Sequence, residues 1–274
     1  MMNINDVNSW KNFKSWQSVT PPSRPDNWQL SIIENELKKF SKKSKIAVLG
    51  STIEFRDLLA KLGYNNVFVF ERNLSFYNYI SNFSKFKYEE TVVAGNWIDT
   101  LSEYRECFDV VLSDLTSGNI PYSVRNDFYR DISNSLVFSG IFIDRILTKS
   151  CPFVPLDTLI SKYEKTEITN QTVNSFNCEV LFCSTLLENP QKVVDTNMFY
   201  DYLISLNKPR ITEFVKACYE ITPRNCIWWY SLDWKYELNI YKNHFNVKQE
   251  FDEPHTSEYF NRAKLLISER RLQL

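Results

Sequence analysis

The sequence predicts an α/β fold in which a doubly wound, mostly parallel sheet ends in an antiparallel hairpin and carries an inserted helical cap. Three observations predict it. Short apolar runs alternate with segments of helical periodicity between residues 45 and 147. All five glycines lie in the stretch from Gly50 to Gly140, so the sharpest turns are confined to it. Two alternating segments after residue 244 are typical of an antiparallel strand pair.

The composition is that of a globular protein. A chain of 274 residues, 43% hydrophobic, suffices for one large domain or for a core with an elaboration. The 32 Lys and Arg residues balance 33 Asp and Glu residues, which argues against nucleic acid or an anionic membrane as partner. The N-terminus has no signal-peptide pattern, and no apolar run approaches the roughly 20 residues of a membrane span. We therefore expect a cytoplasmic protein, whose oligomeric state the sequence leaves open.

The cysteines predict no metal site. Six are present at irregular spacings, without a C-x-x-C pair, and only two histidines accompany them. Ligands for zinc are therefore scarce, and in a cytosolic chain such cysteines are typically reduced, buried apolar residues.

The central stretch predicts five strands separated by helices. Each strand is an apolar run with few charges, which is typical of a parallel sheet covered on both faces. Helical stripes follow, the first running from Phe55 to a C-cap at Gly63 and the last including Leu136. In chain order the expected strands are 45–50, 67–70, 90–94, 109–112 and 141–147.

These patterns divide the chain into four parts. They are an N-terminal helical arm at 1–44, an α/β core at 45–150, a helical cap at 151–243 and a β-hairpin at 244–274 that completes the core sheet. The cap contains no glycine and shows four helical stripes, while its segment 172–187 is ambiguous and favours a helix.

In an open parallel sheet, ligands bind beyond the carboxyl ends of the strands. The first such loop, Gly50 to Glu54, keeps only the first glycine of the dinucleotide fingerprint, and Glu54 would repel a phosphate at the helix N-terminus. A ligand with positive groups and no phosphate suits it better. The alternative, that Ser51 and Glu54 form an S-x-x-E capping box and touch no ligand, is about equally favoured by the loop alone.

Three further strand ends carry polar groups. Glu71 ends the second strand, 21 residues after Gly50, where a carboxylate can accept hydrogen bonds from ribose hydroxyls. Asn96 and Trp97 follow the third strand and could contact an adenine by its edge and its face. Asp114 ends the fourth strand and could neutralise an ammonium or orient a nucleophile. The alternatives are a solvated charge for Glu71, core packing for Trp97 and a helix cap for Asp114.

Residues 45–147 resemble the core of class I S-adenosylmethionine (SAM)-dependent methyltransferases, a Rossmann-like family. The phrases 48–54, 95–97 and 109–114 carry the resemblance, and the C-terminal hairpin is similar to the sixth and seventh strands of that fold. Here Ser51-Thr52 stand where the family has further glycines. The resemblance implies SAM as cofactor, with contacts from Gly50, Ser51, Thr52, Glu54, Glu71, Asn96, Trp97, Asp114, Leu115 and, from the N-terminal arm, Arg24.

Methyl transfer is the activity that this resemblance implies. The aromatic residues of the expected cap and the balanced charge favour a small molecule as the substrate. SAM itself provides the electrophile, so the protein chiefly supplies orientation. A general base, if the nucleophile needs one, would be Asp114 or the tyrosinate of Tyr122. Substrate contacts are expected from Thr116 and Asn119 after the fourth strand and from Trp228 and Trp229 in the cap, although aromatic residues at such spacing are also typical of plain core packing.

Two other functions stay open. The protein could transfer or cyclise the aminocarboxypropyl arm of SAM, or it could be a non-catalytic module whose cap binds a protein partner. An NAD-dependent dehydrogenase ranks last, because the second and third glycines of the pyrophosphate loop are missing.

Overall fold

The computed structural model describes residues 16–147, 153–187, 193–222, 226–229, 234–252, 258–259 and 263–271. The chain forms two compact units. The core unit contains residues 25–147, 234–253 and 263–274, and the helical unit contains residues 1–24, 148–233 and 254–262.

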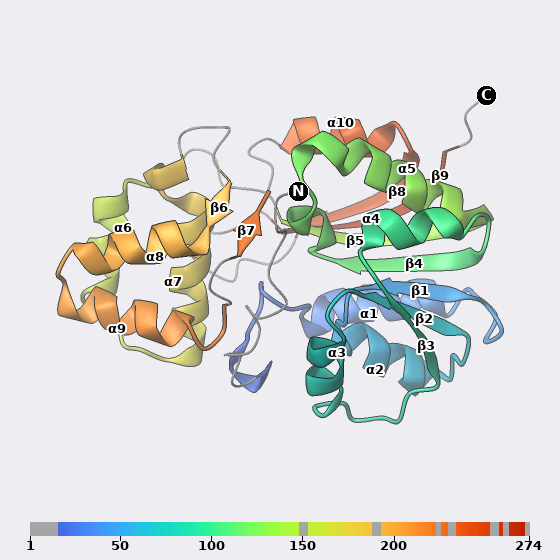
Figure 1. The fold of residues 1–274 in the computed structure, drawn as a ribbon, viewed down its shortest axis with the longest axis horizontal. Coiled ribbons are helices and arrows are strands. Elements are labelled where there is room, and N and C mark those ends of the chain that lie inside the picture. Colours follow the sequence, from blue (N-terminus) through green and yellow to red (C-terminus); the bar gives the residue numbers. More distant parts are fainter. Residues whose placement is uncertain are drawn as a thin grey trace. The chain divides into compact units, whose positions relative to one another are not determined.

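The core unit is built on a seven-stranded sheet (Figure 1). Its strands, in spatial order, are β3 (Glu90–Ala94), β2 (Val67–Glu71), β1 (Ile46–Leu49), β4 (Phe108–Asp114), β5 (Leu136–Leu147), β9 (Ala263–Arg270) and β8 (Phe245–Asp252). The pairs from β3 to β5 are parallel, and β9 runs antiparallel to both of its neighbours. The strand order reverses between β1 and β4, which is where such sheets bind ligands.

Helices cover both faces of this sheet because the strands are apolar on both sides. Ile46 and Val48 of β1 enter one hydrophobic cluster, while Ala47 and Leu49 enter the other. Side chains of α1 (Asn27–Leu37) and α2 (Ile53–Leu62) join the first cluster, and α3 (Leu74–Ser81) lies on the same side (Figure 1). Side chains of α4 (Trp97–Thr100), α5 (Arg125–Ser135) and α10 (Trp234–Lys242) pack in the second cluster.

The predicted alternation of strands and helices is confirmed, including the helix C-cap at Gly63, whose φ of +77° is left-handed. The prediction that Leu136 belongs to the last helical stripe is wrong. Leu136 begins β5 and pairs with Phe108, so the helix ends at Ser135. Gly140 lies within β5, where a Cβ atom would stand 2.9 Å from the carbonyl oxygen of Phe108.

The compact units group two helices differently from the expected domain boundaries. Helix α1, expected in a separate N-terminal arm, buries Ile33 and Leu37 in the core cluster. Helix α10, expected in the cap, stacks Tyr241 on Phe142 of β5 at 5.8 Å between ring centroids. The helical unit in turn includes residues 1–24 and 254–262. The antiparallel hairpin of β8 and β9 is confirmed.

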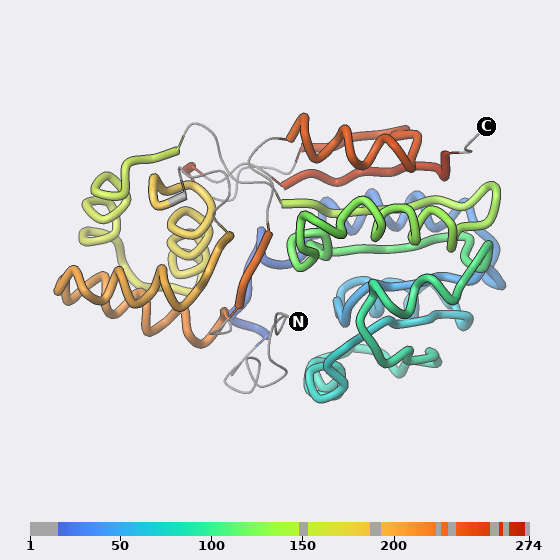
Figure 2. Tube along the Cα trace, turned by 45° about the horizontal axis from the view of Figure 1, so that its top comes forward, coloured from blue at the N-terminus to red at the C-terminus, as the bar shows by residue number. Residues whose placement is uncertain are grey.

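The helical unit contains α6 (Leu156–Tyr163), α7 (Asn170–Cys183), α8 (Thr196–Ser205) and α9 (Pro209–Cys218), which are grouped in Figure 2. The ambiguous segment 172–187 is thus mostly helical, as expected. Rings of Tyr163, Phe176 and Phe214 meet at 4.9–5.1 Å and form part of its interior. The sequence did not predict the short antiparallel pair of β6 (Val194–Asp195) and β7 (Ile227–Trp228).

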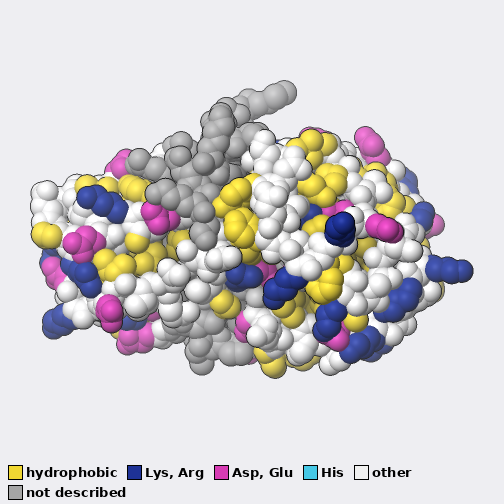
Figure 3. Space-filling model, turned by 90° about the horizontal axis from the view of Figure 1, so that it is seen from below, with side chains coloured by type: hydrophobic (Ala, Val, Ile, Leu, Met, Phe, Trp, Pro, Cys, Tyr) yellow, Lys and Arg dark blue, Asp and Glu magenta, His cyan; other side chains and the backbone are white. Residues whose placement is uncertain are grey.

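The remaining sequence expectations concern the surface and the cysteines. Basic and acidic side chains both occur on the face shown in Figure 3, consistent with the near-zero net charge. Cys178, Cys183, Cys218 and Cys226 are buried and Cys107 is half-buried, while Cys151 lies outside the described residues. Within the described ranges, no helix is both long enough and apolar enough to cross a bilayer.

Candidate functional site

The loop after β1 requires a glycine because of its backbone conformation. Gly50 has a φ of +89°, a left-handed value that other residues rarely adopt. The ring of Trp97 lies at ordinary contact distance, 3.6 Å from the place that a Cβ atom would take. The N–H of Gly50 donates to the carbonyl oxygen of Phe70 at 2.9 Å, which ties the loop to the end of β2.

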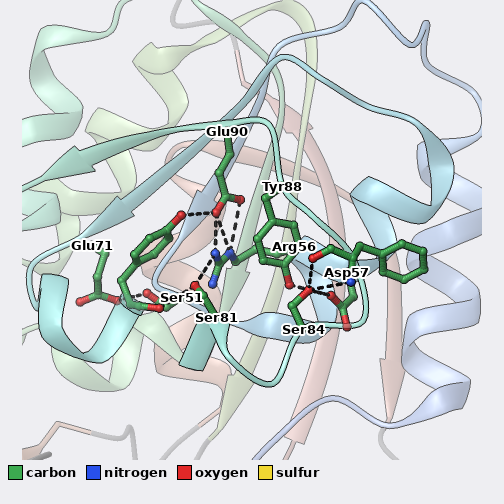
Figure 4. A network of polar contacts seen from close by, with 10 residues as sticks. Ser51, Arg56, Asp57, Glu71, Ser81, Ser84, Tyr88 and Glu90 are labelled. Atoms are coloured by element: carbon green, nitrogen blue, oxygen red, sulfur yellow. Dashed lines mark hydrogen bonds and ion pairs between the residues drawn. The ribbon is translucent and has the colours of Figure 1, made fainter. Parts of the chain in front are cut away.

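Glu71 is a buried carboxylate at the end of β2. It is 7% exposed, and Figure 4 shows it beside Ser51. The hydroxyl of Ser51 donates to Oε2 at 2.7 Å, and the backbone N–H of Asn73 donates to Oε1 at 2.7 Å. These bonds orient the carboxylate, and two oxygens have about four acceptor sites, so capacity for ligand hydroxyls remains. Burial raises the pKa of Glu71 above its ordinary value.

The contact between Ser51 and Glu71 rules out the capping-box alternative for the first loop. The N-cap of α2 is Thr52, and no side chain caps this helix end. Ser51 is turned to β2 instead, so the two predicted cofactor residues, 20 positions apart, meet directly. Glu54 occupies the first turn of α2 as expected and is buried.

Asp114, at the end of β4, is balanced by a buried cation. Its Oδ1 lies 2.6 Å from Nη1 of Arg145, the residue beside it on β5, and its Oδ2 accepts from the hydroxyl of Thr52 at 3.3 Å. The side chains of Asp114 and Arg145 are 6% and 0% exposed. Asp114 thus connects the β1 loop, through Thr52, to β5, through Arg145. A carboxylate held by two such partners favours an orienting role over proton abstraction.

Asn96 and Trp97 both lie at the third strand end and both have structural contacts. The side-chain oxygen of Asn96 caps α4 by accepting from the N–H of Ile98 at 3.4 Å. The indole N–H of Trp97 donates to the carbonyl oxygen of Phe70 at 2.8 Å, which holds the ring against Gly50. The ring therefore lies against the β1 loop while also packing on the core.

The residues after β4 are fixed by the sheet. Leu115 has a left-handed φ of +57°, and its N–H donates to the carbonyl oxygen of Arg145 at 2.8 Å. Thr116 is 1% exposed and donates to the carbonyl oxygen of Leu49 at 3.4 Å, which argues against its predicted contact with substrate. Asn119 is half-buried, and its amide donates to the carbonyl oxygen of Leu115 at 3.3 Å.

Tyr122 cannot supply the predicted tyrosinate near neutral pH. Burial raises the pKa of Tyr122 to about 12, and the neighbouring Arg125 guanidinium, 4.9 Å from the ring centroid, offsets this only in part. The phenol therefore stays protonated, so Tyr122 can donate a hydrogen bond but does not abstract a proton.

Three predicted site residues belong to the helical unit. Arg24 donates to the carbonyl oxygens of Trp16 and Val19 at 3.3 and 3.4 Å. Trp228 lies in β7, and Trp229 is 8% exposed, as a core residue would be. Their contacts with cofactor or substrate stay predictions.

Sequence reasoning missed the charged residues of β5. Asp144 and Arg145 are adjacent charges inside the apolar run 141–147, and this was the signal that could have found them. Asp144 is 1% exposed. Its burial, with the charges of Glu237 and Asp114 nearby, raises its pKa to about 8. In the part of the chain that the structure describes, no three His, Cys, Asp or Glu side chains are grouped as metal ligands would be.

Sequence comparison finds no counterpart: no family model matches this chain and no curated protein matches it. Solved structures do match. A candidate Zn-dependent alcohol dehydrogenase from Rhodobacter sphaeroides is 15% identical, with 97% of this chain and 98% of that chain covered and a TM-score of 0.57.

Methyltransferases recur among the solved structures. A SAM-dependent methyltransferase from Methanosarcina mazei is 11% identical, with 88% of this chain and 98% of that chain covered and a TM-score of 0.53. The N-methyltransferase NodS from Bradyrhizobium japonicum, solved with S-adenosylhomocysteine (SAH), is 6% identical, with 98% and 100% covered and a TM-score of 0.51. At such identities a likeness shows the fold and not the activity. The chain has the Rossmann-like fold of class I SAM-dependent methyltransferases.

Proposed function

We propose that this protein is a SAM-dependent methyltransferase that acts on a small molecule. The observation that carries the proposal is the buried carboxylate of Glu71, oriented by Ser51 and by the N–H of Asn73. It ends β2, and the β1 loop with Gly50 is tied to the same strand end, beside the point where the strand order reverses.

The residues present fit an adenosine without phosphates. Glu71 can accept hydrogen bonds from both ribose hydroxyls, and the ring of Trp97 offers an apolar face beside Gly50. The loop lacks the further glycines that let a pyrophosphate approach, and Glu54 in the first turn of α2 disfavours an anion there. Asp114 is the group that would meet the ammonium of the amino-acid arm.

The chemistry would depend chiefly on orientation. Bound SAM supplies an electrophilic methyl group, so the chain has to align a nucleophile with it and exclude water. Asp114 is engaged by Arg145 and Thr52, and Tyr122 keeps its proton near neutral pH. A nucleophile that arrives neutral and already deprotonated, such as an amine, suits this site best.

A small molecule is proposed as substrate because the net charge is close to zero, which gives no long-range field for nucleic acid. One structural neighbour is named as an N-methyltransferase solved with SAH, which agrees with the proposed cofactor.

The test is calorimetric titration of the full chain with SAM, SAH and NAD⁺. We expect SAM and SAH to bind and Glu71→Ala to weaken SAM by about 1–3 kcal/mol, because a charged hydrogen-bond acceptor for ribose is lost. The matched control is Glu103→Ala, which removes an exposed carboxylate of the same unit and should leave the affinity unchanged. Unchanged SAM affinity in Glu71→Ala, or binding of NAD⁺ in place of SAM, would contradict the proposal.

Mass spectrometry of the product separates the remaining chemistries. Methyl transfer releases SAH, whereas transfer or cyclisation of the aminocarboxypropyl arm releases methylthioadenosine. Incubation with SAM and a panel of small amines and phenols should yield SAH, and methylthioadenosine as the sole product would exclude methyl transfer.

A further inference from the structure

The segment between β4 and α5 makes several contacts with one side chain, that of Arg125. This segment, residues 115–124, contains two short 3₁₀ turns and carries the predicted substrate residue Asn119. Nη2 of Arg125 donates to the carbonyl oxygen of Ser117 at 2.7 Å and to that of Ile120 at 3.0 Å. The same guanidinium lies 4.9 Å from the ring centroid of Tyr122. One planar cation therefore contacts the segment at three places.

Arg125 is itself held by a distant part of the chain. Its Nη1 lies 2.7 Å from Oε2 of Glu237 in α10, and both side chains are 1% exposed. The hydroxyl of Tyr129 donates to the other oxygen of Glu237 at 2.8 Å. Glu237 thus accepts from two residues of α5 and fixes the direction of the guanidinium.

The stability of the helix does not explain this arginine. Arg125 is the first residue of α5, where the helix dipole disfavours a cation. Burying an ion pair also costs desolvation free energy, which the mutual attraction often fails to exceed. What this position does allow is the pair of hydrogen bonds from Arg125 to the carbonyl oxygens of Ser117 and Ile120, which lie outside the helix.

The start of the segment has a separate attachment. Leu115 and Thr116 are hydrogen bonded to the carbonyl oxygens of Arg145 and Leu49 in the neighbouring strands. The sheet therefore holds the first two residues, and Arg125 holds the part from Ser117 to Tyr122.

We propose that Arg125, oriented by Glu237, is a positioning residue that holds residues 117–122 in the shape needed to meet the amino-acid arm of SAM and the substrate. The inference rests on the proposed function. It assigns a role to two residues that contact neither ligand: Arg125 acts through the segment, and Glu237 acts through Arg125.

The experiment compares Arg125→Lys with Arg130→Lys. Lysine keeps the charge at position 125, but a single ammonium lacks the planar fork that reaches two carbonyl oxygens and Glu237 together. Arg130 is an exposed residue of the same helix with surface ion pairs to Asp127 and Asp131, so its replacement is the matched control. Hydrogen–deuterium exchange of residues 115–124 and the dissociation constants of SAH and adenosine are measured for each protein.

We expect Arg125→Lys to raise exchange in residues 117–122 about tenfold and to weaken SAH about tenfold, with adenosine within twofold of the unaltered protein. Adenosine lacks the amino-acid arm, so a general loss of stability would weaken both ligands alike. Glu237→Gln, which keeps hydrogen bonding but removes the charge, should produce the same pattern with smaller changes and stands in if Arg125→Lys does not fold. Arg130→Lys should change nothing.

The inference is overturned if both ligands weaken equally, or if exchange in residues 117–122 and the SAH affinity stay unchanged in both variants. Failure of the proposed function looks different. The unaltered protein would then bind neither SAH nor adenosine, which would also remove any role for Arg125 in a SAM site.

Discussion

The buried carboxyl of Asp144 makes the stability of the protein depend on pH. It lies at the carboxyl end of β5 beside Ser113, in the sheet register next to the pair of Asp114 and Arg145. Burial raises its pKa from 3.8 to about 8 in the folded protein. Between these values the folded state keeps a proton that the unfolded chain releases, so this group makes the protein less stable as the pH rises from about 4 to about 8.

Asp144→Asn should therefore stabilise the protein at neutral pH. Asparagine mimics the protonated carboxyl, so we expect a gain of about 1–4 kcal/mol in the unfolding free energy at pH 7 and little gain at pH 4. Denaturant unfolding at both pH values measures it. Asp99→Asn, at an exposed carboxylate of the same unit, is the control and should show little pH-dependent difference. A gain independent of pH would disprove the assignment of the charge effect to Asp144.

At the residue scale, strand ends were predictable and side-chain partners were not. Gly50, Glu71 and Asp114 follow apolar runs, and strand geometry alone brings such positions to one edge of the sheet. The partners Arg145 and Glu237 lie 31 and 112 positions away from the residues that they contact, and no local pattern encodes such pairs.

At the element scale, Arg56 joins α2 to the edge of the sheet. The buried guanidinium lies between the rings of Tyr77 and Tyr88, at 4.3 and 4.2 Å from their centroids. It pairs with Glu90 of β3 at 2.5 Å and donates to the hydroxyl of Ser81 at 2.8 Å (Figure 4). Its contacts therefore extend from α3 to β3.

Arg56→Lys should destabilise the protein by about 2–4 kcal/mol, since lysine cannot stack between two rings and would leave part of the buried network unpaired. Chemical denaturation gives the difference. Lys61→Arg, which exchanges the same two residue types at an exposed position of α2, should stay within about 0.5 kcal/mol of the unaltered protein. Equal unfolding free energies for the two variants would mean that the contacts of Arg56 do not contribute to the stability of the fold.

Element type followed from periodicity, and element limits did not. Helix α2 begins and ends close to its predicted positions because apolar spacing and Gly63 mark them. The start of β5 was missed because Leu136 fits the preceding helical stripe, and its pairing with Phe108 depends on a residue 28 positions away. Strands β6 and β7 have two residues each, too few to show an alternating pattern.

At the scale of the whole molecule, the distribution of glycine along the sequence does not show which helices belong to which unit. Helices α1 and α10 contain no glycine, as the cap does not, yet both join the core unit because their apolar side chains pack on the sheet. Sequence patterns therefore predicted the layers of the core, while the assignment of helices to units depends on packing between distant segments.

This division predicts where SAH protects the backbone from hydrogen exchange. We expect protection of the loops at 50–54, 71–73 and 95–97 and of residues 114–116, all in the core unit. Peptides from α6 and α9 should exchange at the same rate with and without SAH. Protection confined to these helices, with the four core segments unchanged, would contradict a site at the strand ends.

A crystal structure of the protein with bound SAH tests the central claim most directly. The account predicts both ribose hydroxyls within about 3.2 Å of the carboxylate oxygens of Glu71, with Ser51 still bonded to that carboxylate. A ribose that contacts other residues, or SAH bound away from the carboxyl ends of β1, β2 and β4, would contradict it.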